Sequence, residues 1–221
     1  MLNKIVDKLK QLSRNPVSVD FERFNDPLAA QTAWTPLKSG GSNFRTHKLV
    51  MIGTNRVEFR PTVFAYIFFS IFMLAGLGVM VGGLHMLYEQ GFEWEGHNLF
   101  MIIIGGVFAL VGSLLMVFMG SPAVFDNMYG YFWKGRKKVD FGIGHTYPDK
   151  FTELNQIHAL QIIAEHVRSS KSSYYSYELN LVLKDGSRKN VVDHGNIKRL
   201  REDALTLSQF LGRPVWDGVA R

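Results

Sequence analysis

The sequence predicts a membrane protein of the α+β class, in which two spanning helices are combined with a β-rich domain closed by a terminal helix. Residues 61–119 contain no Lys or Arg, so the apolar content is concentrated in one block. The residues after this block alternate between apolar and polar as strands do, and then repeat apolar residues at helical spacing. The chain has no cysteine, which excludes disulfide frameworks, thiol nucleophiles and zinc–thiolate sites.

Two long apolar runs are the predicted membrane helices. Residues 61–87 and 99–119 are 27 and 21 residues long and contain no Asp, Glu, Lys or Arg. At a rise of about 1.5 Å per residue, each run is long enough for a hydrocarbon core of about 30 Å. A helix satisfies its backbone hydrogen bonds internally, as a lone crossing in lipid requires. We therefore expect a transmembrane hairpin over 61–119, with an outer loop at 88–98.

The distribution of charge predicts the orientation of this hairpin. The loop at 88–98 holds three Glu and no Lys or Arg. Residues 1–60 hold 10 Lys and Arg against 5 Asp and Glu, and residues 120–221 hold 15 against 11. Because basic flanks remain on the cytoplasmic side of a membrane, both termini are expected in the cytoplasm.

Small residues recur along both runs and predict close helix packing. Such residues let two helix backbones approach each other. The short loop favours packing of the hairpin on itself, and a seam between copies of the chain is the alternative. A channel built from such copies would lack Asp, Glu, Lys and Arg within its spans, which weakens it as a hypothesis. The candidate packing residues are Gly78, Gly82, Gly105, Ala109 and Ser113.

The residues before the first apolar run divide into three parts. Residues 1–14 have the spacing of an amphipathic basic helix, which would lie on an anionic lipid surface or cover a sheet of the same chain. Residues 15–43 are expected as an irregular extension with exposed aromatic residues, Phe21, Phe24 and Trp34. Residues 44–52 and 56–60 predict a β-hairpin. Since a lone hairpin is barely stable in water, it is expected to join a sheet formed after the membrane block.

Residues 120–221 are numerous enough for a compact domain. Apolar and polar residues alternate over 175–183, which predicts a strand with one apolar face. Asp185–Gly186 predicts a tight turn of the primed type, followed by a partner strand over 188–194. Residues 123–125 and 129–133 suggest another pair, and 159–167 is expected as a strand, with a helix as the alternative. A cap at Asn196, helical spacing and a stop at Gly212 predict a helix over 197–211.

This order of elements resembles that of the bacterial pleckstrin-homology-like (PH-like) membrane proteins, over residues 120–216. The residues that carry the resemblance are Phe125-Asp126, the return at 129–135, Leu154-Asn-Gln-Ile157 before a strand, the hairpin YELNLVLKDGSR and the closing helix. The resemblance implies a PH-like roll, a place in the bacterial inner membrane, and a scaffold or regulatory role rather than an enzyme activity. The long polar extension before the first span departs from the usual plan of that family.

No pattern in the sequence predicts a catalytic, cofactor or metal site. The nucleophile elbow, the P-loop, the HExxH pair and the dinucleotide fingerprint are absent. A metal site would need histidines from distant parts of the chain to converge, so His145, His158, His166 and His194 are expected as polar residues at strand edges. The chain is therefore predicted to be no enzyme and to need no cofactor.

The basic residues predict contact with anionic lipid headgroups. Residues 134–138 hold four cations soon after the second span, and the N-terminal helix would add others. The small excess of positive charge over 120–221 disfavours a nucleic-acid partner. The candidate headgroup-binding residues are Lys134, Arg136, Lys137, Lys138, Lys4 and Lys8.

The leading hypothesis is thus an inner-membrane scaffold or accessory protein whose cytoplasmic domain binds a protein partner or organises a membrane complex. A module that binds anionic lipid and a small homo-oligomeric channel component are the alternatives.

Overall fold

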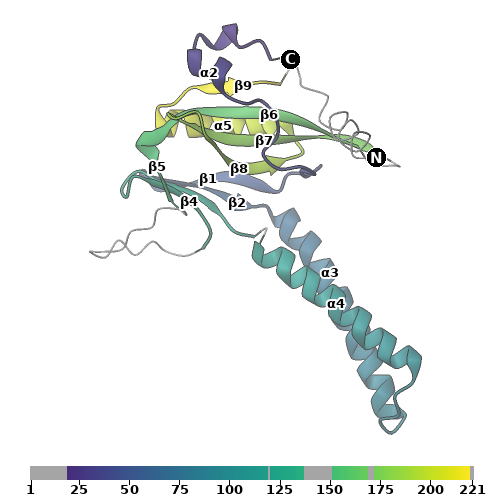
Figure 1. Ribbon diagram of the computed structural model, residues 1–221. Helices are drawn as coiled ribbons and strands as arrows, with labels where there is room; N and C mark the ends of the chain where they lie inside the picture. Colours follow the sequence, from purple (N-terminus) through teal and green to yellow (C-terminus); the bar gives the residue numbers. More distant parts are fainter. Residues whose placement is uncertain (1–18, 119, 137–150, 169–171, 220–221) are drawn as a thin grey trace. The chain divides into compact units, whose positions relative to one another are not determined.

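The computed structural model describes residues 19–118, 120–136, 151–168 and 172–219 (Figure 1). The chain divides into a helical unit over Arg60–Pro122 and a β-rich unit, which combines the residues up to Phe59 with those from Ala123 onward. The predicted N-terminal helix over 1–14, with Lys4 and Lys8, lies outside the described residues, and so do Lys137 and Lys138.

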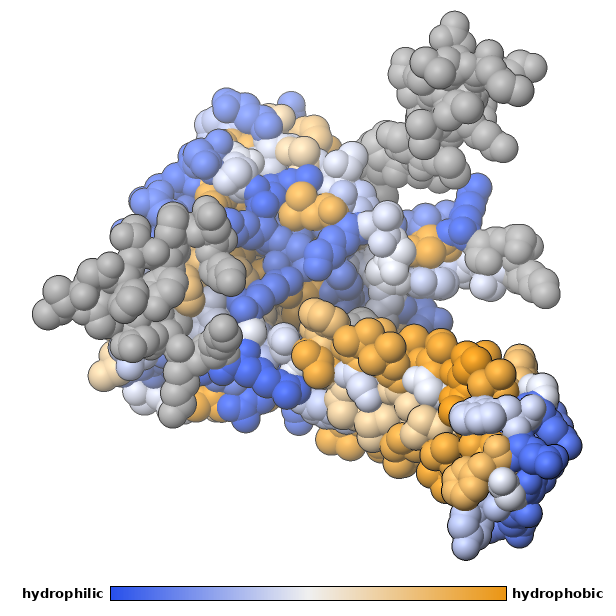
Figure 2. Space-filling model, turned by 60° about the horizontal axis from the view of Figure 1, so that its bottom comes forward, coloured by the Kyte–Doolittle hydropathy of each residue, from blue (hydrophilic) through white to orange (hydrophobic). Residues whose placement is uncertain are grey.

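The helical unit is a hairpin of α3 (Val63–Glu89) and α4 (Gly96–Phe118). α3 begins after Thr62, whose hydroxyl accepts a hydrogen bond from the Ala65 amide at 3.2 Å. Both helices are long and apolar enough to cross a membrane. Their outward surface is apolar along most of its length, and polar residues gather at the loop end (Figure 2).

Glycine residues bring the two helices into backbone contact. A Cβ added to Gly76 would collide with the amide nitrogen of Ala109, and one added to Gly105 would collide with the amide nitrogen of Met80. Two residues of the predicted stripe, Gly105 and Ala109, therefore lie where α4 meets α3 in the same chain. The Ser113 hydroxyl bonds back to the Ala109 carbonyl at 2.8 Å, within α4.

The α3 side of this contact consists of Gly76 and Gly83, the neighbour of the predicted Gly82. A Cβ on Gly83 would lie 3.0 Å from the Asn98 carbonyl oxygen, and Gly83 follows Gly76 by two helical turns. Of the predicted residues, Gly78 faces open space among the described atoms, and Gly82 would meet only the methyl group of Met101, at 3.4 Å. Which of the neighbouring glycines faces α4 depends on the rotation of α3 about its own axis. Residue spacing alone does not define that rotation.

Asn98 organises the loop between the helices. It is fully buried, and its amide nitrogen donates to the Gln90 side chain at 2.8 Å and to the Glu93 carbonyl at 3.1 Å. Its side-chain oxygen accepts from the Glu95 amide at 3.1 Å. A single side chain thus satisfies two main-chain groups of the loop.

Sheet A of the β-rich unit has five strands in sequence order: β1 (His47–Ile52), β2 (Arg56–Pro61), β3 (Ala123–Asp126), β4 (Tyr131–Lys134) and β5 (Phe151–Glu153). β2 pairs with β3 in antiparallel fashion, with Val57 opposite Phe125. This pairing confirms that the N-terminal hairpin joins a sheet formed by residues after the helices.

Sheet B has four strands: β6 (Ile157–Arg168), β7 (Ser173–Leu183), β8 (Arg188–His194) and β9 (Val215–Asp217), in the order β8-β7-β6-β9. β9 runs parallel to β6, and the other pairs are antiparallel. The segment 159–167 is therefore a strand, as expected. It is followed in the chain by its partner β7, with Ile162 opposite Leu179.

The turn between β7 and β8 differs from the predicted one. Three residues, Lys184 to Gly186, separate Leu183 from Ser187, whose carbonyl accepts from the Leu183 amide at 2.8 Å. Gly186 alone has a left-handed backbone, with φ of 79°. Both primed two-residue turns need positive φ at the first central position, which Asp185 does not have, so this is the longer loop that ends in a left-handed glycine.

One apolar core lies between sheet A, sheet B and α5 (Ile197–Leu211). Sheet A contributes Phe59 and Phe125, and sheet B contributes residues such as Leu179. α5 presents the stripe Leu200, Ala204 and Leu207, all fully buried. Asn196 caps the helix by accepting from the Arg199 amide at 3.1 Å, and Gly212, with φ of 63°, ends it.

Candidate functional site

Residues 19–43 lie over the outer face of sheet B, the face opposite the core. They contain a short 3₁₀ turn, η1 (Glu22–Phe24), and one short helix, α2 (Pro27–Gln31). Phe24 stacks on Trp34 with ring centroids 5.3 Å apart, and both rings lie near Trp216 of β9, at 6.1 and 6.2 Å. The expectation of exposed aromatic residues is therefore wrong for Phe24 and Trp34, because the outer face of sheet B is itself apolar around Trp216.

The segment 33–41, which we call the strap, crosses this face as irregular chain (Figure 1). Two carboxylates of sheet B each hold two main-chain N–H groups of the strap. Glu178 of β7 accepts from the amides of Leu37 and Lys38 at 2.9 and 2.8 Å. Glu165 of β6 accepts from the amides of Gly40 and Gly41 at 3.0 and 3.2 Å. Such charge-assisted bonds are stronger than those between neutral groups.

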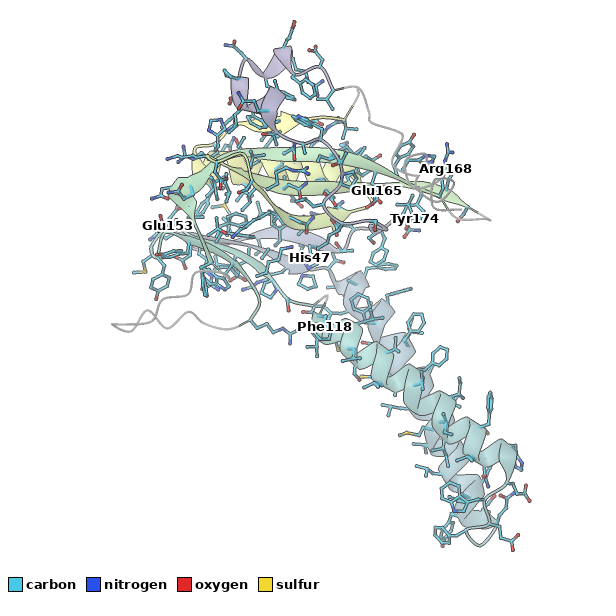
Figure 3. The ribbon with its side chains drawn as sticks, viewed as in Figure 1. His47, Phe118, Glu153, Glu165, Arg168 and Tyr174 are labelled. Atoms are coloured by element: carbon cyan, nitrogen blue, oxygen red, sulfur yellow. The ribbon has the colours of Figure 1, made fainter. Side chains whose placement is uncertain are left out.

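Three further side chains of sheet B bind carbonyl groups of the strap. Gln161 donates to the Ala33 carbonyl at 3.0 Å, Arg188 to the Thr35 carbonyl at 2.9 Å, and the Tyr174 hydroxyl to the Gly41 carbonyl at 2.9 Å. Glu165 and Tyr174 lie toward the same end of the sheet (Figure 3). We call these side chains together the strap-binding face: Gln161, Glu165, Tyr174, Glu178 and Arg188.

The Glu178 carboxylate is buried and therefore needs its hydrogen bonds to the strap. Glu178 is only 1% exposed, and a buried carboxylate without partners would cost several kcal/mol. Besides the two strap amides, it accepts from the Asn180 side-chain amide at 2.9 Å. Burial also lowers the pKa of the Arg188 guanidinium, and attraction to Glu178 opposes that shift. The strap is therefore part of what makes a charged residue tolerable on this face.

The polar residues of β7 lie on a buried face, not on a solvent face. Ser176, Glu178 and Asn180 have 0 to 1% exposure and alternate with core residues. The prediction of a strand with one apolar face is correct, and the polar face of this strand is buried as well. Residues of the strap, far away in the sequence, exclude water from this polar face. The sequence contains a partial indication that this face is buried, because Ile163 and Val182 place apolar side chains on it.

The strap approaches the sheet closely at Gly41. A Cβ at this position would collide with the Ser176 hydroxyl and lie 2.8 Å from the Ser176 Cβ. Gly41 therefore has a steric reason to be glycine. Two buried atoms on the same face, Ser176 Oγ and Asn180 Oδ1, have no hydrogen-bond partner in the described part of the chain.

Of the candidate headgroup-binding residues, the structure describes Lys134 and Arg136. Lys134, at the end of β4, donates to the Asn190 side chain at 2.9 Å. Although part of its side chain remains in contact with solvent, the surrounding protein lowers the pKa of its ammonium to about 8, and Lys38 adds repulsion. Arg136 is exposed.

The histidines play separate roles. His158 pairs with Asp26 at 2.7 Å, which ties the start of α2 to β6. His166 stacks on Tyr175 with centroids 4.8 Å apart. His194 lies on β8, an edge strand of sheet B, but it is fully buried, and burial lowers its pKa to about 4. No group of three His, Asp or Glu residues suited to a metal ion occurs in the described ranges.

Comparison with protein-family models, with curated proteins and with solved structures finds no match for this chain.

Proposed function

We propose that the protein is a membrane-anchored scaffold, not an enzyme, whose β-rich unit binds an extended segment of a protein partner. The observation that carries the proposal is the strap-binding face, where seven hydrogen bonds from five side chains hold the main chain of residues 33–41. Main-chain N–H and C=O groups are common to all protein segments. A face that binds them suits a protein ligand better than a small molecule.

The anchor in this proposal is the helical unit. The exposed apolar side chains of α3 and α4 would be stable in lipid and unfavourable in water. The acidic loop and the basic flanks support insertion in the bacterial inner membrane with both termini in the cytoplasm. The β-rich unit, with its terminal helix α5, would then be a cytoplasmic PH-like domain.

Two other functions have less support. An anionic-lipid module would use Lys134, but this residue already binds the Asn190 side chain. A homo-oligomeric channel would use Gly105 and Ala109 between copies, but these residues are occupied by α3 of the same chain.

Site-specific photo-crosslinking in native membranes tests the proposed function. A photoreactive amino acid replaces Leu37, which lies in the strap and is 40% exposed, and in the matched control it replaces Leu205, which is 58% exposed on α5. We expect one discrete protein adduct from position 37, none of the same mass from position 205, and a reduced yield when Glu178→Gln is added. Adducts with lipid alone, or equal capture from both positions, would reject the proposal.

A further inference from the structure

We propose, resting on the proposed function, that residues 33–41 are a replaceable internal ligand and that the partner supplies an extended segment with an aromatic residue followed seven positions later by glycine. The strap-binding face thus has a defined ligand chemistry, for which the chain's own strap is a template.

Most strap side chains do not contribute to binding. Thr35, Leu37, Lys38 and Ser39 are exposed, whereas the main chain around them is bound by Gln161, Arg188, Glu178 and Glu165. The strap is not a strand of either sheet, so no ladder of main-chain bonds connects it to a neighbour. A foreign segment of different sequence could make the same main-chain bonds.

At two positions of the strap, the strap-binding face restricts which side chain fits. The Trp34 ring lies 6.2 Å from the Trp216 ring, and Gly218 leaves the space for it, since a Cβ there would lie 2.7 Å from the Trp34 ring. At Gly41, any Cβ would collide with Ser176. An aromatic anchor and a glycine seven residues later are therefore the requirements that this face places on its ligand.

The strap satisfies this face incompletely, which is the reason to treat it as replaceable. Ser176 Oγ and Asn180 Oδ1 are on fully buried residues and find no hydrogen-bond partner in the described ranges. Buried polar groups are almost always paired, so two orphans beneath one segment point to a ligand that is not the strap. A partner segment that offers an N–H to Asn180 and an acceptor to Ser176 would displace the strap.

A synthetic peptide with the sequence of residues 31–43 is the probe. It is labelled with a fluorophore and titrated against the full-length protein in detergent. In the wild-type chain the covalently attached strap competes at high effective concentration, so binding is weak. In the chain variant Gly41→Ala the strap is partly expelled, and we expect the peptide to bind at least tenfold more tightly. The matched chain variant Ser39→Ala, at an exposed position, should bind the peptide like the wild type.

The peptide itself tests the two selective positions. Against the Gly41→Ala protein, peptides with Trp34→Ala or Gly41→Ala should bind at least tenfold more weakly, and a peptide with Ser39→Ala should bind equally well. In the Gly41→Ala protein, a further Ser176→Gly substitution should bring the Gly41→Ala peptide and the unchanged peptide to equal affinity, because it removes both Ser176 atoms with which a Cβ would collide. Equal binding by all peptides, or no gain in the Gly41→Ala protein, would overturn the inference.

Hydrogen exchange provides a measurement on the unaltered chain, in case Gly41→Ala does not fold. Excess peptide should accelerate exchange at the amides of residues 37–41 and leave the amides of β6 unchanged. Unchanged exchange in the strap at saturating peptide would show a permanent cover and reject the inference. Its failure is distinct from that of the proposed function: a partner crosslinked at position 37 with no effect of the peptide rejects only the ligand chemistry, whereas peptide binding without a membrane partner rejects only the scaffold.

Discussion

The two faces of sheet B are built from the same strands and bury their residues equally well, but they do so by different chemistry. The inner face contacts sheet A and α5 through apolar residues such as Leu160, Ile162 and Leu179. The outer face consists of the alternate residues of the same strands, and it buries Gln161, Glu178 and Asn180 beneath the strap. Apolar burial is non-directional, whereas buried polar groups require specific partners. The inner face therefore stabilises the fold, and the outer face specifies which chain segments can lie on it.

The largest effect is expected from a cavity on the inner face. Leu179→Ala removes a fully buried side chain from the centre of the core and should lower the free energy of unfolding of the β-rich unit by about 2–5 kcal/mol. The slowest-exchanging amides of β6 report this change by hydrogen exchange in the full-length protein. Leu205→Ala, at an exposed position of α5, is the control and should change these rates little. Equal effects of the two variants would contradict the assignment of the core.

The next effect comes from a titratable residue at the end of β8. His194 is fully buried opposite Tyr177, and burial, with repulsion from Arg45, lowers its pKa from 6.5 to about 4. The unfolded chain therefore binds the proton at a higher pH than the folded chain does. Stability should be complete above about pH 6.5 and should fall by roughly 3 kcal/mol as the pH decreases to about 4.

The pH dependence of exchange at the β6 amides measures this effect. The His194→Gln variant should lose that part of the slope between pH 6.5 and 4, even if its stability near pH 7 is reduced. His158→Gln is the comparison, because this histidine is paired with Asp26 near the surface. The same slope in wild type and His194→Gln would show that another group titrates.

The contrast between the faces also explains how much of the molecule the sequence predicts. Alternation over β7 identifies Leu179 and Leu181 as core, and helical spacing identifies Leu200 and Leu207, because both patterns are local. The helical hairpin is equally evident, because the length and the lack of charge of each apolar run can be recognised without knowing what it packs against. The sequence also predicts that the N-terminal hairpin joins a larger sheet, because an isolated pair of strands is barely stable without neighbours.

The candidate site is not predictable in the same way. Glu178 has the sequence signature of a solvent-exposed residue, and its burial depends on amides 140 and 141 positions earlier in the chain. The strap has no periodicity, because its main chain is held by side chains rather than by a helix or a ladder. The turn at Gly186 is a smaller example of a feature that the sequence predicts incompletely. The dipeptide Asp185–Gly186 predicts a residue with left-handed backbone but not the length of the loop.

An intermediate effect is expected from weakening the outer face. Glu178→Gln keeps the shape of the side chain but loses the charge and one of the two acceptors for the amides of Leu37 and Lys38. The free energy of opening the strap should fall by about 2 kcal/mol, as expected for a bond to a charged group. Exchange at residues 37 and 38 should accelerate while the β6 amides stay protected. Glu153→Gln, at an exposed site in β5, is the control and should leave exchange unchanged both at residues 37 and 38 and in β6.

The smallest effects separate two hydroxyl groups of the outer face that lie two residues apart. The Tyr174 hydroxyl donates to the Gly41 carbonyl, so Tyr174→Phe should lower the free energy of strap opening by about 1 kcal/mol. The Ser176 hydroxyl is buried without a partner in the described ranges, so Ser176→Ala should leave strap opening unchanged or raise its free energy by up to about 1 kcal/mol. Exchange at Gly40 and Gly41 measures both variants. Loss of protection in Ser176→Ala would mean that this hydroxyl already binds the strap, and the orphaned polar group would no longer argue for a second ligand.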